Sequence, residues 1–156
     1  MYSMILFAYN PFMRDNRFLE EKLDGIINKH FSDVSISNNV RIKFGRKAVK
    51  RLGSIRRIRK RGLRGLIAKN MDTEITLSGY FRAPEVPEYV IDAVIAHELC
   101  HYFHGFSSPL PQLYEHPHKG NIVEKEMLKR GLDMTLSQHK SWIDKEWFPY
   151  IKSLYR

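Results

Sequence analysis

The chain has 156 residues, of which 43% are hydrophobic and 12% aromatic, a composition that excludes a disordered tail and predicts one folded domain over residues 1–156. Its only cysteine is Cys100, which excludes an intrachain disulfide framework and a cysteine-rich zinc ribbon. No run approaches the ~18 apolar residues of a membrane span, and the apolar start of the chain is too short for a signal-peptide core. We therefore expect a soluble cytoplasmic protein with no membrane partner.

The net charge of +9 is concentrated in one segment. Residues 41–71 contain 13 Lys or Arg and no Asp or Glu, whereas the rest of the chain contains 13 basic and 17 acidic residues. Such a segment is typical of a surface that binds DNA or another polyanion, and equally typical of solvated strands with long basic side chains. Under the first interpretation, the nucleic-acid-binding residues are predicted to be Arg56, Arg57, Arg59 and Lys60.

The first half of the chain predicts one helix and several short strands. Asp15 or Asn16 can cap a helix that runs to about His30, with apolar residues at helical spacing. Strand patterns follow over residues 40–44, 53–60, 64–70 and 73–78. Arg61-Gly62 is the expected turn of a hairpin, and residues 46–52 fit either more strand or one helical turn. Strands followed by helices predict an α+β domain with a small antiparallel sheet of three or four strands.

A second helix is predicted between Pro87 and Gly105, which suit its first turn and its end. It contains the run His97-Glu98-Leu99-Cys100-His101. Positions i and i+4 are neighbours on one helix face, so His97 and His101 can direct their ring nitrogens at one metal ion. A catalytic Zn²⁺ takes three protein ligands and a water, and Glu98 can serve as general base toward that water. The alternative is a surface helix with two unrelated histidines.

A third zinc ligand must come from elsewhere in the chain. The downstream candidates are His104, Glu115, His116, His118, Glu124 and Glu126. His104 lies near the same stripe but one turn beyond His101, so it should be out of reach of the metal and serve in packing or in a supporting contact.

The loop over residues 106–117 contains three prolines and cannot continue a helix. It can return the chain to the metal at the start of a helix expected over residues 118–130, which favours His118 as the third ligand, with His116 second. Glu124 or Glu126 would give a His-His-Glu site instead. The last 20 residues predict a further helix that Pro149 kinks or divides.

Three segments together resemble the SprT-like zinc metallopeptidases: Glu74–Ser78, Pro87–His101 and His118–Ile122. In that family a strand ending near "I-x-L-S" precedes the His-Glu-x-x-His helix, and a third His lies four residues before an apolar residue of the next helix. His118 and Ile122 match this last pattern, whereas His116 does not. Residues 40–53 also look like the family's first strand and the glycine after it, so the resemblance covers about residues 40–131.

The resemblance implies a zincin-like fold and a zinc metalloendopeptidase that cleaves protein or peptide substrates, including DNA-bound or DNA-crosslinked proteins. It also implies that the strand near residues 73–78 lines the cleft and pairs with an extended substrate. Zinc would polarise the scissile carbonyl and its bound water, while Glu98 moves the proton from water to leaving amine. Tyr102, Tyr114 or an arginine could stabilise the oxyanion. Two alternatives stay open: a minimal cytosolic metallopeptidase without a nucleic-acid role, and a non-catalytic nucleic-acid-binding module with structural zinc.

Overall fold

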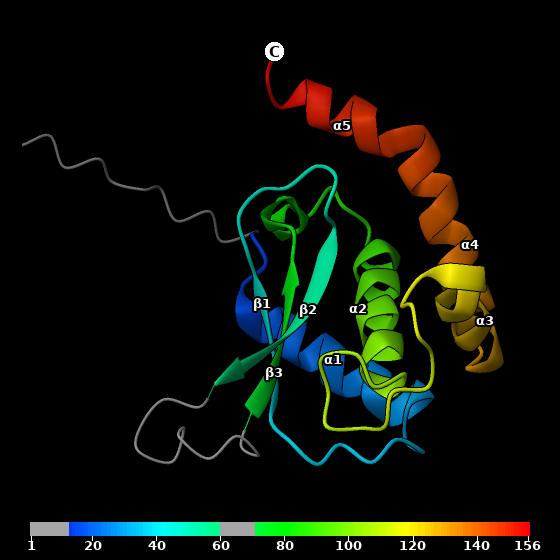
Figure 1. Cartoon of the computed structure of the whole chain (residues 1–156). Coiled ribbons are helices and arrows are strands. Elements are labelled where there is room, and N and C mark those ends of the chain that lie inside the picture. The colour runs from blue at the N-terminus through cyan, green and yellow to red at the C-terminus, as the bar shows by residue number, and fades with distance from the viewer. Residues whose placement is uncertain (1–12, 60–70) are drawn as a thin grey trace, which may run out of the picture.

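The computed structural model describes residues 13–59 and 71–156 (Figure 1). Its helices are α1 (Asn16–His30), α2 (Glu88–Phe103), α3 (Ile122–Lys129), α4 (Asp133–Trp142) and α5 (Phe148–Ser153), and its strands are β1 (Val40–Phe44), β2 (Gly53–Arg59) and β3 (Met71–Leu77). Short 3-10 turns lie at η2 (Gly79–Arg82) and η3 (Lys119–Asn121), and a π turn at η4 (Ile143–Trp147). Among these helices, none has both the length and the apolar composition needed to cross a bilayer. The hairpin turn and the strand predicted over residues 64–70 lie outside the described residues.

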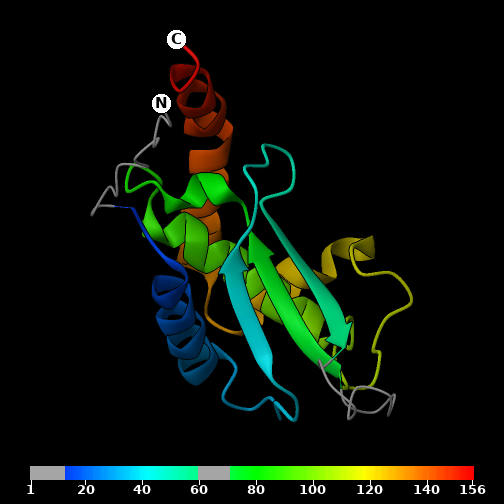
Figure 2. The same cartoon turned by 90° about the vertical axis from the view of Figure 1, so that its left-hand side faces the viewer.

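The α+β class is confirmed, but the prediction of an antiparallel sheet is wrong for one of its two pairings. The strand order is β1-β3-β2, and Figure 2 shows β3 between its two neighbours. β3 runs antiparallel to β2 and parallel to β1, with Val40 opposite Thr73. After β1, residues 45–52 cross to the opposite edge of the sheet, where the chain forms β2. The next strand, β3, then returns to the middle of the sheet, between β1 and β2. Strand order depends on this crossing, which local alternation of residues does not reveal.

The predicted first helix and first strand are confirmed. α1 begins after Asp15, whose side chain accepts a hydrogen bond from the Phe18 N–H at 3.0 Å. This cap satisfies one of the backbone donors that the first helical turn leaves without a partner. Ile42 and Phe44 of β1 are buried, as their alternation with basic residues predicts. α1 packs on β1 and also touches α2, which closes one end of the core.

The predicted helix that contains the two histidines is also confirmed, as α2. It lies between the sheet on one side and α3 and α4 on the other (Figure 1). Eleven of its 16 residues are buried, including Ile91, Ile95 and Leu99. Fully burying each such aliphatic side chain contributes roughly 1.5–3 kcal/mol, so α2 is held by contacts on several sides. This central position fixes the direction of the polar side chains that α2 also carries.

Residues 45–52 form neither strand nor helix, but their backbone is tied to two other elements. The Ser78 hydroxyl donates to the Ala48 carbonyl at 2.8 Å and accepts from the Ala48 N–H at 3.1 Å. The Trp147 indole N–H donates to the Val49 carbonyl at 3.0 Å, and the Ser78 N–H donates to the Leu52 carbonyl at 2.8 Å. We call residues 45–52 the crossover loop. Its path is fixed on both sides of Lys50 and Arg51.

The helix predicted from His118 begins later, at Ile122. Gly120 and Asn121 have φ angles of +73° and +55°, a left-handed conformation that an α-helix does not contain and that glycine and asparagine adopt most readily. His118 therefore lies just before the 3-10 turn η3. The final helical region is divided near Pro149, as predicted: η4 separates α4 from α5, and proline has no N–H to continue the α-helical bonding.

Candidate metal centre

Three imidazoles converge beside the middle of α2. His97 and His101 lie one turn apart on that helix, and His118 reaches them from the end of the loop before η3. One ligand nitrogen from each ring can be chosen so that all three lie within 4.8 Å of one another. The His101 and His118 ring centroids are 4.7 Å apart, and those of His97 and His118 are 5.8 Å apart. The structure therefore brings together all three residues predicted as zinc ligands.

The spacing of the two ligand nitrogens on α2 fits a tetrahedral zinc ion, and the remaining separations, which reach up to 4.8 Å, would shorten when the ion binds. Nε2 of His97 and Nε2 of His101 are 3.1 Å apart. With Zn–N bonds of 2.0–2.1 Å, two nitrogens of a tetrahedral site lie roughly 3.3 Å apart, so little adjustment is needed. A set of three neutral imidazoles also leaves a fourth position open, as catalytic zinc requires. The donor set does not identify the metal by itself, because imidazole also suits other transition metals.

The electrostatics of the two helix histidines favour the neutral form that binds metals. Burial lowers the pKa of His97 to about 4, and the neighbouring imidazole of His118 acts in the same direction. Burial lowers the pKa of His101 to about 3, with His97 and His118 contributing. Because a ligand must lose its proton before it binds a metal, these rings offer free lone pairs at neutral pH.

This result predicts how the stability of the metal-free protein depends on pH. An imidazole whose pKa is lower in the folded protein than in the unfolded chain binds protons preferentially when unfolded. The free energy of unfolding of the metal-free protein should therefore fall as the pH drops from about 6.5 toward 4. The decrease is at most ~1.4 kcal/mol per pH unit for each such imidazole. Denaturant titrations between these pH values measure it.

The control for this prediction is His97→Asn, which keeps a polar side chain but removes one titrating ring. Its free energy of unfolding should depend less steeply on pH over the same interval. Glu98 acts in the opposite direction: its raised pKa contributes stability at low pH that is lost as the pH rises through about 7. An identical pH dependence in wild type and His97→Asn would contradict the assigned protonation state.

Glu98 is the second functional feature of α2. Its side chain is buried, and burial raises its pKa to about 7. Gly53, the first residue of β2, lies directly against it: a Cβ atom at Gly53 would be 2.7 Å from Glu98 Oε1. The absence of a side chain at this position therefore leaves space for the carboxyl group. A carboxyl group with a pKa near neutrality is suited to take up and return a proton.

The other proposed ligands lie elsewhere. His104 is fully buried, with Nε2 3.9 Å from a Glu126 oxygen and its ring against Tyr114, so it is part of the core. Glu126 also pairs with Arg130 at 2.8 Å. His104 and Glu126 are thus separate from the three-histidine cluster, as the helical spacing predicts for His104.

The remaining alternatives are closer to solvent. His116 is exposed and its nearest carboxylate is its neighbour Glu115, at 3.7 Å. Glu124 lines a cavity together with His97 and His118, but it pairs with Lys140 at 2.8 Å. Within the described residues, these side chains are not among the groups that could jointly hold a metal ion.

Two cavities meet at His97 and His118, with Gly53 and Glu98 in the wall of both, and His101 lines the second. The first, here called the α4-side cavity, has a volume of about 530 Å³ and lies toward α3 and α4. The second, the loop-side cavity, has a volume of about 400 Å³ and reaches Ile55 and Ser107. A chain that occupies both cavities would pass the metal position and Glu98 at its middle.

The sheet edge beside the loop-side cavity is β2. The expectation that the strand near residues 73–78 pairs with substrate is wrong, because β3 is the central strand and is paired on both sides. In the antiparallel pair, Leu52 bonds to β3 through its carbonyl, so the alternation directs the N–H and C=O groups of Gly53 and Ile55 outward. The Ser107 hydroxyl reaches the Ile55 carbonyl at 3.4 Å, in agreement with this direction.

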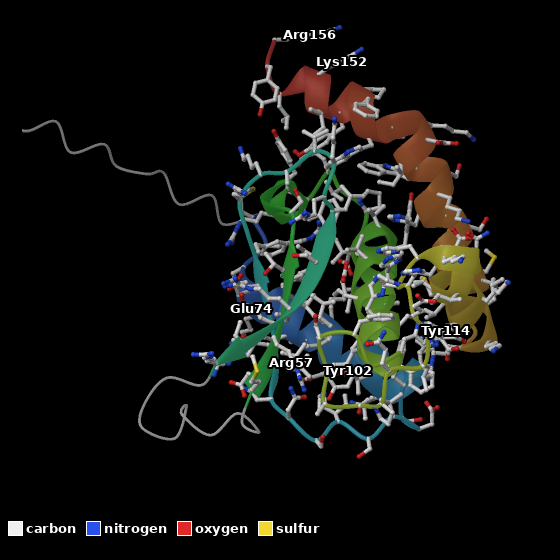
Figure 3. The ribbon with its side chains drawn as sticks, viewed as in Figure 1. Arg57, Glu74, Tyr102, Tyr114, Lys152 and Arg156 are labelled. Carbon is white, nitrogen blue, oxygen red and sulfur yellow. The ribbon has the colours of Figure 1, made fainter. Side chains whose placement is uncertain are left out.

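Of the proposed oxyanion donors, only an arginine is well placed. The Tyr102 hydroxyl donates to Asn38 at 2.7 Å, and Tyr114 packs on His104. Figure 3 shows the two tyrosines at separate places near the end of α2, and neither lines either cavity. Arg51 of the crossover loop lines both.

The basic segment does not form one continuous patch in the described residues. Glu74 of β3 pairs with Lys43 and with Arg56, at 3.0 and 2.7 Å, on the face of the sheet away from α2 (Figure 3). Arg57 and Arg59 are exposed and form no ion pair with the described carboxylates. Lys60, the fourth residue predicted to bind nucleic acid, lies outside the described residues.

Sequence reasoning missed two groups in the α4-side cavity. His139 of α4 lines it, and burial lowers the pKa of its ring. Lys50 of the crossover loop lines the same cavity. Neither residue is part of a recognisable local motif, because the chain brings them to the site only through long-range packing.

Comparisons of this chain with models of protein families, with curated proteins and with solved structures give no match.

Proposed function

We propose that the protein is a zinc-dependent metallopeptidase. The observation that carries the proposal is the placement of three imidazoles and the buried Glu98 carboxyl group where two cavities meet, beside the open edge of β2. His97, His101 and His118 would hold the zinc ion. When bound, zinc supplies a Lewis acid that polarises the scissile carbonyl and lowers the pKa of the attacking water.

The edge of β2 would bind an extended segment of the substrate. The outward backbone groups of Gly53 and Ile55 can form main-chain hydrogen bonds with such a segment. This mode of recognition depends little on the amino-acid sequence of the substrate. The loop-side cavity lies along this edge and would take the substrate residues before the scissile bond.

Glu98 would carry the proton. It accepts a proton from the attacking water and returns it to the leaving amine, and a carboxyl pKa of about 7 is suited to both steps near neutral pH. Gly53 leaves free the space that this carboxyl group occupies.

The proposal is tested by incubating zinc-loaded protein with an unfolded protein substrate and mapping the new termini by mass spectrometry. Discrete internal cleavage sites that disappear on chelation are expected. An intact substrate after prolonged incubation of fully zinc-loaded protein would favour the alternative of a non-catalytic module.

Replacement of Gly53 by alanine should lower peptidase activity while the protein keeps its zinc. The added Cβ would meet both Val94 and the Glu98 carboxylate, so the general base must move. A displacement of about 1 Å can cost roughly 100-fold in rate, and we expect a loss of this order in kcat. Steady-state kinetics and metal analysis of the purified variant measure the two quantities.

The matched control for Gly53→Ala is Gly25→Ala in α1. A Cβ at Gly25 would meet no atom within 4 Å, and alanine favours the helix by roughly 1 kcal/mol. This control should be fully active. Full activity in Gly53→Ala would show that the contact with Glu98 does not position the base.

We further propose that the substrates include proteins bound or crosslinked to DNA. The concentration of basic residues in the segment 41–71 supports this, together with the exposed positions of Arg57 and Arg59 on β2, where neither forms an ion pair with a described carboxylate. The alternative is a metallopeptidase without a nucleic-acid role, in which these arginines only meet solvent.

Removing Arg57 and Arg59 together should weaken DNA binding and its dependence on salt. Each phosphate contact contributes about 0.9 to the magnitude of the slope of log affinity against log salt on duplex DNA. The magnitude of this slope should therefore be roughly 1.8 smaller in Arg57→Gln/Arg59→Gln than in the parent. Arg56→Gln is the matched control, because Arg56 is already paired with Glu74 and we expect a smaller change. Fluorescence anisotropy across a salt series measures the slopes; equal slopes in parent and double variant would exclude a role of Arg57 and Arg59 in DNA binding.

A further inference from the structure

The α4-side cavity contains cationic groups that take no part in the proposed proton transfer. Part of its wall is apolar, with Leu52, Val94 and Met127 among its residues. Its cationic lining comes from two elements: the crossover loop contributes Lys50 and Arg51, and α4 contributes Lys140. This combination of an apolar wall and positive charge is suited to a short side chain that ends in an anionic group.

Among the described residues, the carboxylates of the lining neutralise one of these three cations, Lys140, and leave Lys50 and Arg51 without an ion pair. Glu124 lies in the lining, but it pairs with Lys140 at 2.8 Å. Glu98 is the other carboxyl group of the lining and faces both cavities, where it is assigned to proton transfer. No carboxylate in residues 13–59 and 71–156 forms an ion pair with Lys50 or Arg51.

The position of these two cations is fixed by the backbone. The carbonyl just before Lys50 accepts from the Trp147 indole, and the carbonyl just after Arg51 accepts from the Ser78 N–H. A loop anchored in this way does not have to be ordered when a ligand binds, so the entropy cost falls on the two side chains alone. Placement and charge together point to recognition of an anion.

We propose that the α4-side cavity is a subsite for a carboxylate of the substrate, and that Lys50 and Arg51 are the residues that select it. The inference rests on the proposed peptidase function and adds the substrate class to it. The carboxylate can belong to a Glu or Asp side chain or to the C-terminus of the substrate. Charge-assisted hydrogen bonds from Lys and Arg are the interactions that would distinguish it from a neutral amide.

The topology also gives the position of this carboxylate along the substrate. Antiparallel pairing is the more stable arrangement, and a substrate strand antiparallel to β2 runs from the Arg59 end toward Gly53. Residues before the scissile bond then lie along the loop-side cavity, and the chain continues past the metal position into the α4-side cavity. The selected carboxylate therefore belongs to the first residue after the scissile bond.

The test uses zinc-loaded protein and matched peptides that differ only at the first residue after the scissile bond. Glu, Gln and Lys are compared there, with a further pair that ends at this residue as a free carboxylate or as an amide. We expect kcat/KM to be roughly tenfold higher for Glu than for Gln, the size of one charge-assisted hydrogen bond. In Lys50→Gln/Arg51→Gln, the ratio of these two kcat/KM values should fall to about one.

The matched control is Arg46→Gln/Lys47→Gln, which removes two charges from the same loop at positions that do not line this cavity. Its ratio for Glu over Gln should equal that of the parent. Binding of the same peptides to zinc-loaded Glu98→Gln, measured by fluorescence anisotropy, gives a second readout that needs no turnover. The affinity for the Glu peptide should again exceed that for the Gln peptide.

The outcomes separate the subsite from the peptidase function. Cleavage of all the peptides without preference for a carboxylate would overturn the subsite and leave the peptidase function standing. A preference restricted to the free C-terminal carboxylate would support the subsite and identify its source. If no peptide is cleaved, the peptidase function fails, and the anisotropy then decides: a preference for Glu that Lys50→Gln/Arg51→Gln abolishes supports the subsite, and equal affinities overturn it.

Discussion

Glu98→Gln should abolish peptide cleavage while the protein keeps its fold and its zinc. The glutamine side chain has the same shape but cannot take a proton from water, and loss of a general acid–base group typically costs ~10²–10⁴ in rate. The cost to stability should be small, because burial already disfavours the charged form of Glu98 and raises its pKa to about 7. Progress curves, bound zinc and thermal unfolding are measured on the same preparation.

The control is Glu21→Gln on the exposed surface of α1, which makes the same chemical change far from the site. It should match the parent in all three measurements. Substantial cleavage by Glu98→Gln would show that another group moves the proton. A large loss of zinc in this variant would instead show that Glu98 supports the metal directly.

His118→Ala should release zinc without unfolding the protein. Two imidazoles remain, which is one ligand fewer than a catalytic site holds. Removing a group that only supports a ligand already costs ~10–100-fold in metal affinity, so the loss of His118 should exceed about 100-fold. The fold should survive because His118 is exposed, in contrast to the buried His101. Competition with a chelator measures the affinity.

Two neighbours provide controls for this variant. His116→Ala removes an exposed imidazole two residues away, and it should leave zinc binding unchanged. Glu124→Ala removes a carboxylate that is engaged with Lys140, and it should retain zinc as well. If His118→Ala keeps its zinc while Glu124→Ala loses it, the site is of the His-His-Glu class.

Local sequence patterns predicted the parts of the molecule whose geometry is itself local. The i, i+4 spacing places His97 and His101 on one stripe of α2 wherever that helix packs, so their proximity needed no knowledge of the fold. The Asp15 cap and the alternation in β1 are of the same kind. His118 could be chosen over His116 only with the help of the resemblance, because the length of a loop does not determine which of its residues reaches the metal.

The parts that were not predicted depend on contacts between distant segments. The edge position of β2 follows from the crossing of residues 45–52, so the expectation that β3 pairs with substrate is wrong. The approach of Gly53 to Glu98 follows from the same crossing. Arg56 belongs to the segment 41–71, which contains no acidic residue. The sheet nevertheless places it beside Glu74, which lies on β3 just after that segment. Charge along the chain therefore overstates charge on the surface.

Titration of metal-free protein with zinc shows whether one zinc ion held by three histidines enables peptide cleavage. After each addition of zinc, cleavage of the same peptide at constant concentration is recorded for the parent and for Glu98→Gln. We predict that the activity of the parent rises linearly up to one equivalent of zinc and then stays constant, while Glu98→Gln binds the same equivalent and remains inactive. Cleavage by the metal-free protein would contradict the role of the zinc ion, and equal activity of the two proteins at saturation would contradict the role of Glu98.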